Sequence, residues 1–451
     1  MTGHLTLFEI PRMGDPGSSR NKLGIWTTTS LVMGNMIGAG IFLIPSTLAA
    51  YGGISLLGWL FSATGALMIA AVFSRMSRIF PGISGGPYAY TQKGFGHFAG
   101  FLMAWGYWIS VWTANAALTV SFVGALSTFV PLLKDHAVPA ILTGLGAIWF
   151  LTWINTRGIL ASGRMQLVTT ILKLIPLLVI SVGGLFFIHV AHFSPFNLSG
   201  QSDFSAITIT ASTTFFAFLG IECATIPAAN VENPAKTVPL ATMAGTILAA
   251  LVYILGTFSL MGIIAPGELR NSVTPFADAG ASIWGNAARY WIAAGAAIAA
   301  FGTLNGWILI QGQIPYATAK DRLFPAIFGR ENKKGVPAAG IIIGSLLVSL
   351  LMMMNYTKGL VEQFRFLIML STLTCLVPYL FTVAAYAVIT MKNKSLNRPR
   401  AGSLVLASLA FIFTFWVIAG TGQEIVYWGF LLLMTGIPFY VWVTRKNKNN
   451  P

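Results

Sequence analysis

Three glycines, Gly34, Gly38 and Gly40, lie within seven residues of one another in the apolar stretch GNMIGAGIF. A glycine in a helix interior costs about 1 kcal/mol relative to alanine, so three of them favour local unwinding. The N–H groups released at such a break suit a carboxylate, because the N-terminus of a helix attracts anions. The alternative is close helix packing through small residues.

A second stretch of the same kind is FAFLGIE, from Phe216 to Glu222, which is followed by Pro227. Carbonyl groups released at this break suit an ammonium group. The two breaks together predict a site that holds the carboxylate and the ammonium of an amino acid by backbone alone.

Two ionisable side chains accompany these breaks. Lys173 lies in TTILKLIPLL, nine residues and therefore about 14 Å along a helix from Arg164. Such a residue is expected to face the bundle interior and to carry a proton during transport, unless its side chain snorkels to the membrane surface. Glu222 would gate the pathway, bind a cationic substrate or carry a proton; the alternative is a cap on backbone N–H groups.

Trp307 and Asn115 are polar or aromatic residues in the middle of apolar segments. Trp307 could cover a substrate or stack on a cation, and core packing explains it equally well. Asn115 fits a ligand contact and an interhelical hydrogen bond equally well.

Motifs of catalysis and of metal binding are missing from the sequence. It contains no HExxH or P-loop pattern, and its two cysteines, Cys223 and Cys375, both lie in apolar runs. These features argue against an enzyme, a disulfide framework and a metal site, and no cofactor is expected.

The elements that must position these residues are membrane spans. The 451 residues are 55 % hydrophobic and 9 % charged, whereas soluble proteins carry about 25 % charged residues. At roughly 20 residues per span, this composition supplies about twelve spans. The twelve predicted segments are 24–50, 53–74, 98–130, 137–155, 164–188, 205–229, 238–264, 285–312, 338–355, 361–390, 402–420 and 425–444.

The distribution of positive charge predicts the orientation. With the N-terminus inside, 21 of the 27 Lys and Arg residues fall in inner segments and five in outer loops, and Lys173 alone lies within a span. This bias places both termini in the cytoplasm. It also accounts for the net charge of +15 without nucleic acid as a partner.

The two breaks lie five spans apart, and an odd offset turns the second copy of a repeat upside down in the membrane. The prediction is an all-α membrane protein with a cytoplasmic leader at 1–23, an inverted-repeat transport core of ten helices at 24–390, and helices 11 and 12 with a short basic tail at 391–451.

Several longer motifs resemble the amino acid–polyamine–organocation superfamily, and within it most closely the basic amino acid/polyamine antiporters. The resemblance covers residues 23–445 and is carried by GNMIGAGIFLIP, GGPYAY at 85–90, FLGIE at 218–222, NPAKTVPLAT at 233–242, GW at 306–307, DRLFP at 321–325 and VPYL at 377–380. It implies twelve helices, with spans 1–5 and 6–10 as inverted repeats and helices 1 and 6 broken at the midplane.

The resemblance also implies roles for particular residues. Backbone around Met36, Gly38, Ala39 and Gly40 would bind the carboxylate, and backbone near Phe216 and Leu219 would bind the ammonium. The substrate side chain would lie among Ser110, Val111, Asn115, Trp307 and Ser371. The residues that resemble the outer gate are Tyr107, Glu222 and Tyr379.

Three positions depart from the arginine–agmatine pattern, which has Ser, Cys and Trp where this chain has Ala39, Val111 and Phe216. These changes remove polar and indole contacts and argue against strict arginine or agmatine specificity. The lysine at position 173 resembles the pattern of the wider superfamily. In proton-coupled members a lysine at this position is the proposed proton carrier, and it also occurs in proton-independent exchangers.

The function expected from these observations is exchange of amino acids, including cationic ones, or of their decarboxylated amines, across the inner membrane. The first alternative is proton-coupled uptake through Lys173. The second is a sensor or structural subunit that transports nothing, against which the intact break motifs argue. The expected partners are a small-molecule substrate, the lipid bilayer and, for coupled uptake, protons; a homodimer is compatible with the sequence.

Overall fold

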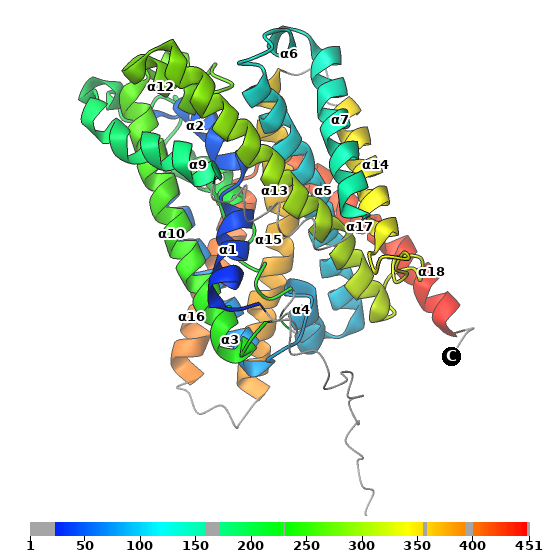
Figure 1. The fold of residues 1–451 in the computed structure, drawn as a ribbon. Coiled ribbons are helices and arrows are strands. Elements are labelled where there is room, and N and C mark those ends of the chain that lie inside the picture. The colour runs from blue at the N-terminus through cyan, green and yellow to red at the C-terminus, as the bar shows by residue number, and fades with distance from the viewer. Residues whose placement is uncertain are drawn as a thin grey trace, which may run out of the picture.

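The computed structural model describes residues 23–157, 172–226, 228, 231–354, 359–392 and 400–448, and within these ranges every regular element is a helix (Figure 1). The single β-type pairing among them is an isolated parallel bridge between Leu23 and Val231, next to a hydrogen bond of 3.0 Å from Glu232 N to Leu23 O. The predicted leader, apart from Leu23, and the start of the fifth predicted segment lie outside the described residues.

Nine helical segments of the described chain are long and apolar enough to cross a membrane. They are α1 (Ile25–Met36) with α2 (Ala39–Ala49), η1 (Gly52–Ile54) with α3 (Ser55–Ile79), α5 (His97–Leu126), α7 (Ala137–Asn155), α10 (Pro234–Ile263), α13 (Asn286–Lys320), α15 (Leu360–Lys392), α16 (Arg400–Ala419), and α17 (Gln423–Met434) with α18 (Gly436–Lys448).

Shorter helices complete the chain. Two of them are apolar, namely the stretch Leu172–Phe187, which ends in η2 (Gly184–Phe187), and α14 (Ala338–Met354). The sixth predicted segment is interrupted and comprises α9 (Asp203–Phe215) and η4 (Phe216–Phe218). The connecting helices are α4 (Pro87–Phe95), α6 (Leu132–Asp135), η3 (Val190–Phe193), α11 (Pro266–Leu269) and α12 (Pro275–Trp284).

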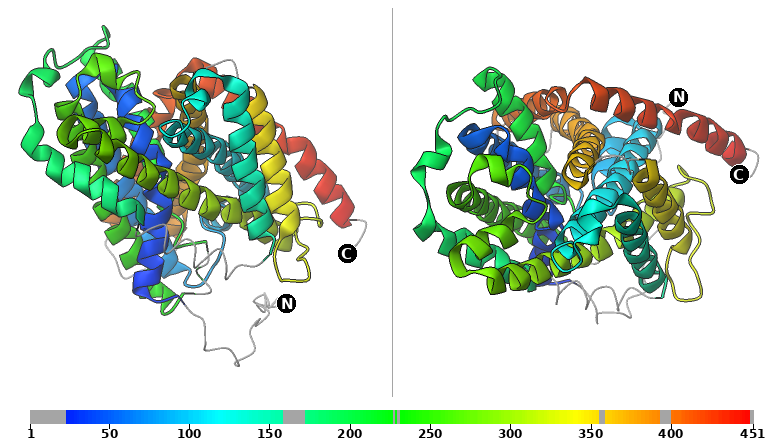
Figure 2. Two further views of the ribbon diagram at one scale, coloured as in Figure 1. Left: turned by 45° about the horizontal axis from the view of Figure 1, so that its top comes forward. Right: turned by 90° about the horizontal axis from the view of Figure 1, so that it is seen from above.

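The long helices α5, α13 and α15 form the centre of the bundle, because α5 packs along both of the others. On one side α1, α3, α9 and α10 pack together, and on the other α7 and α14 pack against α13 (Figures 1 and 2). Helices α16 to α18 run along one edge, and α4 lies at the lower end, against α5 and α15. Helix α13 continues to Lys320, beyond the predicted end at 312, and the twelfth predicted segment is divided at Thr435.

Close packing of α3 on α9 depends on Gly58. A Cβ atom at this position would lie 2.3 Å from Thr210 Oγ1 and 2.9 Å from the Thr210 carbonyl carbon. Contacts this short with backbone do not occur, so the two helices can approach this closely only because residue 58 has no side chain. Gly146 on α7, by contrast, has open space where a Cβ would stand.

This difference gives a stability prediction. Gly58→Ala should destabilise the protein by about 1–3 kcal/mol, because the added methyl group forces α3 and α9 apart. Gly146→Ala is the matched control and should be neutral or stabilising by up to about 1 kcal/mol, since alanine favours the helix. Thermal unfolding of the two purified variants checks this, and equal melting temperatures would contradict it.

Candidate functional site

The first span is broken where the glycine pattern predicts. Helix α1 ends at Met36 and α2 begins at Ala39, and the extended backbone of Gly38 (φ −111°, ψ −166°) separates them. The N–H groups in the first turn of α2 therefore have no carbonyl partner within their own helix, as at any helix start. They form the kind of donor group that binds a carboxylate.

The break also changes the hydrogen bonds at the end of α1. Ile37 N donates to Met33 O at 2.7 Å in the ordinary helical pattern, but Gly38 N turns back and donates to Met36 O at 2.8 Å. In a continuous helix Gly38 N and the following N–H would donate hydrogen bonds to the carbonyls of residues 34 and 35. These two carbonyls must therefore find partners elsewhere.

Two side chains that the sequence singles out supply those partners. Lys173 Nζ donates to Gly34 O at 2.5 Å, and Trp307 Nε1 donates to Asn35 O at 3.2 Å. Lys173 is only 1 % exposed and also donates to Thr303 Oγ1 at 3.2 Å. The lysine therefore points into the bundle and does not snorkel, whereas its part in proton coupling remains a prediction.

The second break follows η4. Leu219 has extended backbone (φ −63°, ψ 129°) and Gly220 has φ +114°, a conformation that favours glycine. Tyr253 of α10 donates to Ala217 O at 3.0 Å, so one carbonyl of this break is also capped by a neighbouring helix. Pro227 lies outside the described residues.

Glu222 follows this break and connects it to two other helices. Its carboxylate accepts hydrogen bonds from the hydroxyl groups of Tyr107 on α5 and Tyr379 on α15. It also accepts one from Gly220 N at 3.2 Å, so the predicted cap on a backbone N–H is present within a larger cluster. All three side chains are buried.

The predicted topology and the resemblance to an outer gate place this cluster on different sides of the membrane. Tyr107 lies ten residues from the His97 end of α5, next to α4, and Tyr379 lies nearer the Lys392 end of α15. The distribution of positive charge assigns both of these ends to the cytoplasm. The cluster is thus on the inner side of the breaks under the predicted topology.

A further contact lies on the same side. Tyr88 of α4, in the GGPYAY motif, donates to Asp321 Oδ2 at 3.3 Å, just beyond the end of α13. Burial raises the pKa of the Asp321 carboxyl group above its usual value. The contact joins α4 to α13 at the lower end of the bundle (Figure 1).

The two breaks meet at one small cavity of about 20 Å³. Such a volume holds a water molecule but not an amino acid, so a substrate enters only if the walls move. Phe216 occupies much of the space, since a Cβ on Gly40 would lie 2.9 Å from its ring. The predicted site residues that line the cavity are Met36, Gly38, Gly40, Phe216, Leu219 and Trp307, and the sequence analysis did not include Asn35, Ala114, Leu118 and Ala217.

Ser110, Val111, Asn115 and Ser371 are not among the residues that line this cavity. Ser371 Oγ donates to Ser110 O at 2.9 Å, which joins α15 to α5, and Val111 is fully buried beside them on α5. Asn115 Nδ2 donates to Gln311 Oε1 at 2.8 Å, so the interhelical alternative for this residue is realised. Ala39 lies between two lining glycines, and the placement of its side chain is not described.

The sequence identified Trp307 but not the two polar residues that share its face of α13. Thr303, Trp307 and Gln311 follow at intervals of four, which places them on one side of a helix. Gln311 Nε2 donates to Ile341 O at 2.8 Å and to Ser345 Oγ at 3.0 Å, so this face ties α13 to α14. The regular spacing of the two polar residues about Trp307 is the signal that could have identified them.

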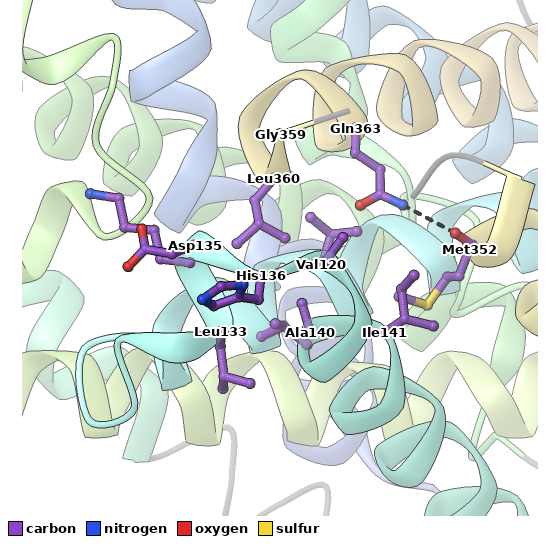
Figure 3. Close-up of a pocket in the computed structure, with 13 residues that line it drawn as sticks. Val120, Leu133, Asp135, His136, Ala140, Ile141, Met352, Gly359, Leu360 and Gln363 are labelled. Carbon is purple, nitrogen blue, oxygen red and sulfur yellow. Dashed lines mark hydrogen bonds between the residues drawn. The ribbon is translucent and has the colours of Figure 1, made fainter. Parts of the chain in front are cut away.

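A second hollow, of about 210 Å³, lies away from both breaks, at the ends of α5 and α7 beside α6 (Figure 3). Gln363 Nε2 donates to Met352 O there at 3.5 Å, and His136 and Asp135 line the same space. None of the break residues reaches this hollow. The cavity between the breaks is therefore the candidate site, although it is the smaller of the two.

Comparison with known proteins places this geometry in context. The model of the amino acid permease family matches residues 23–444. The cadaverine/lysine antiporter of Escherichia coli (strain K12) is 32 % identical over 432 residues, which cover 94 % of this chain and 95 % of that protein. The putrescine transporter PotE of Haemophilus influenzae is 31 % identical over 427 residues, which cover 94 % and 98 %.

The Glu222 cluster gives a second stability prediction. Tyr107→Phe removes a hydrogen bond to a carboxylate and should cost about 1.5–3 kcal/mol, whereas the matched variant Tyr253→Phe removes one to a neutral carbonyl and should cost about 0.5–1.5 kcal/mol. Thermal unfolding of both variants measures the difference. Equal losses would show that the hydrogen bond from Tyr107 to Glu222 is no stronger than one to a neutral carbonyl.

Proposed function

The chain belongs to the amino acid permease family, and we propose that it is an amino-acid exchanger of the inner membrane that works by alternating access. Family membership makes it a multi-pass membrane transporter of amino acids or amines and not an enzyme. The exchange mechanism and the finer architecture, twelve spans with two inverted repeats, are part of the proposal.

One observation carries the proposal most directly: two interrupted helices meet at a single cavity. Backbone N–H groups at the start of α2 would bind the substrate carboxylate, and carbonyls around Phe216 and Leu219 would bind its ammonium. Interrupted helices from two repeats that converge near mid-membrane are typical of substrate sites in secondary transporters. Neither end of the substrate then requires a charged side chain.

Access to this cavity would be controlled from two sides. The Phe216 ring lies over Gly40 and must move to admit a substrate. On the inner side, the Glu222 carboxylate with Tyr107 and Tyr379 connects three elements and would close the cytoplasmic path. Release to the cytoplasm would then require these hydrogen bonds to separate.

The contact of Lys173 with Gly34 supports a second candidate, proton-coupled uptake. The amine binds a carbonyl that the first break releases, so a movement of α1 would change the environment of the proton. A binding energy that differs between the two states is what coupling requires. Exchange remains the first proposal, because it needs no property of Lys173 beyond a structural one.

The test begins with a thermal-shift screen of the twenty amino acids and their amines, since a ligand at 100 times its Kd adds about 2.7 kcal/mol. The ligand found is then used in proteoliposomes. Uptake of labelled ligand that depends on unlabelled ligand inside supports exchange, and accumulation driven by a pH gradient alone supports coupled uptake. A protein that moves nothing under either condition would be a sensor, and the proposal would be wrong.

Lys173→Ala separates the two transport mechanisms. The variant should still bind and exchange substrate, because the backbone site does not include the lysine. If the parent accumulates substrate under a pH gradient, the variant should lose that accumulation while retaining exchange. Equal accumulation in parent and variant would exclude the proton-carrier role.

Gly38→Ala tests the backbone site. Its Cβ would lie 2.7 Å from Thr303 Cγ2, so the break must shift, and we expect substrate binding to weaken by about 1–3 kcal/mol. Thr303→Ser removes that methyl group and keeps the hydroxyl that Lys173 binds. The double variant should regain most of the affinity, measured by calorimetry, and an unchanged Kd for Gly38→Ala alone would refute the site.

A further inference from the structure

The walls of the cavity between the breaks carry no charged side chain among the residues that the structure describes. On α5 the wall consists of Ala114 and Leu118, and rings of Phe216 and Trp307 complete it, together with backbone from the two breaks. We infer that the substrate is an amino acid with an uncharged side chain, and not a cationic amino acid or a diamine. This inference rests on the proposed exchange function and narrows its substrate class.

The carboxylate that follows the second break is not available to a second positive charge. Glu222 does not line the cavity, and both of its oxygens already accept hydrogen bonds, from Tyr107 and from Tyr379 with Gly220 N. In the described part of the chain, one ion pair is found, between Arg289 in the first turn of α13 and Asp278 of α12. A second buried ammonium, beyond the α-ammonium that the released carbonyls would bind, is strongly disfavoured without a carboxylate partner.

Lys173, when it is protonated, disfavours a cation in the cavity. No carboxylate of the described residues lies within 4 Å of its Nζ, which binds Gly34 O and Thr303 Oγ1. Asn35, the residue after Gly34, lines the cavity. A protonated lysine at this place repels a second cation and attracts a carboxylate, so an α-amino acid is favoured over its decarboxylated amine.

The polar groups of the cavity suffice for one ammonium. Asn35 Oδ1 is buried and accepts no hydrogen bond within the described chain, and Phe216, Ala217 and Leu219 of the second break line the same cavity. These acceptors match the α-ammonium that every amino acid has. On the α5 wall, Leu118 offers only hydrocarbon to the side chain of a substrate.

The experiment measures uptake into proteoliposomes that contain the full-length protein and a mixture of unlabelled neutral and cationic amino acids and diamines. Labelled alanine, serine and leucine are compared with labelled arginine, ornithine, lysine, cadaverine and putrescine. We expect at least one neutral amino acid to exchange tenfold or more faster than every cation. Equal or faster exchange of a cation overturns the inference and leaves the exchange function intact, whereas no exchange of any compound overturns both.

A pair of variants at Leu118 tests the cause. Leu118→Asp places a carboxylate on the wall and should raise the ratio of cationic to neutral exchange tenfold or more, and the isosteric control Leu118→Asn should not. A folded Leu118→Asp protein that exchanges neutral amino acids with the parent's ratio overturns the electrostatic argument. If that variant does not fold, the selectivity of the parent protein still decides the inference.

Discussion

A peptide group that loses its helical partner inside a membrane must find another, and this requirement governs the centre of the bundle. At the end of α1 the two carbonyls left over by the turn at Gly38 accept hydrogen bonds from Lys173 and Trp307. Those donors come from the stretch Leu172–Phe187 and from α13, so three segments are fixed relative to one another by one local interruption. The position of the cavity follows from this arrangement.

The two breaks meet the same requirement in different ways. The first is served by donors, an amine and an indole, because it leaves carbonyls at the end of a half-helix. The second leaves an N–H group at Gly220 as well as the Ala217 carbonyl, and it is served by an acceptor, Glu222, and by the Tyr253 hydroxyl. A carboxylate near the second break and a lysine near the first thus have a structural reason to be there, whatever further role each has in transport.

The sequence predicted the breaks, the helical class and most of the spans, since glycine spacing and apolar length act locally along the chain. It did not predict that Asn115 would bind Gln311, or that Thr303 would lie against Gly38 and Lys173. Those contacts depend on how each helix is rotated about its axis, which composition does not specify.

The bridge between Leu23 and Val231 links the two interrupted spans at their cytoplasmic ends under the predicted topology. The chain entering α1 and the chain leading into α10 are held edge to edge, and the Glu232 N–H strengthens the link. The link ties the start of α1 to the start of α10, and these two helices also pack against each other. Under the proposed function, a movement of α1 at this end would therefore carry α10 with it.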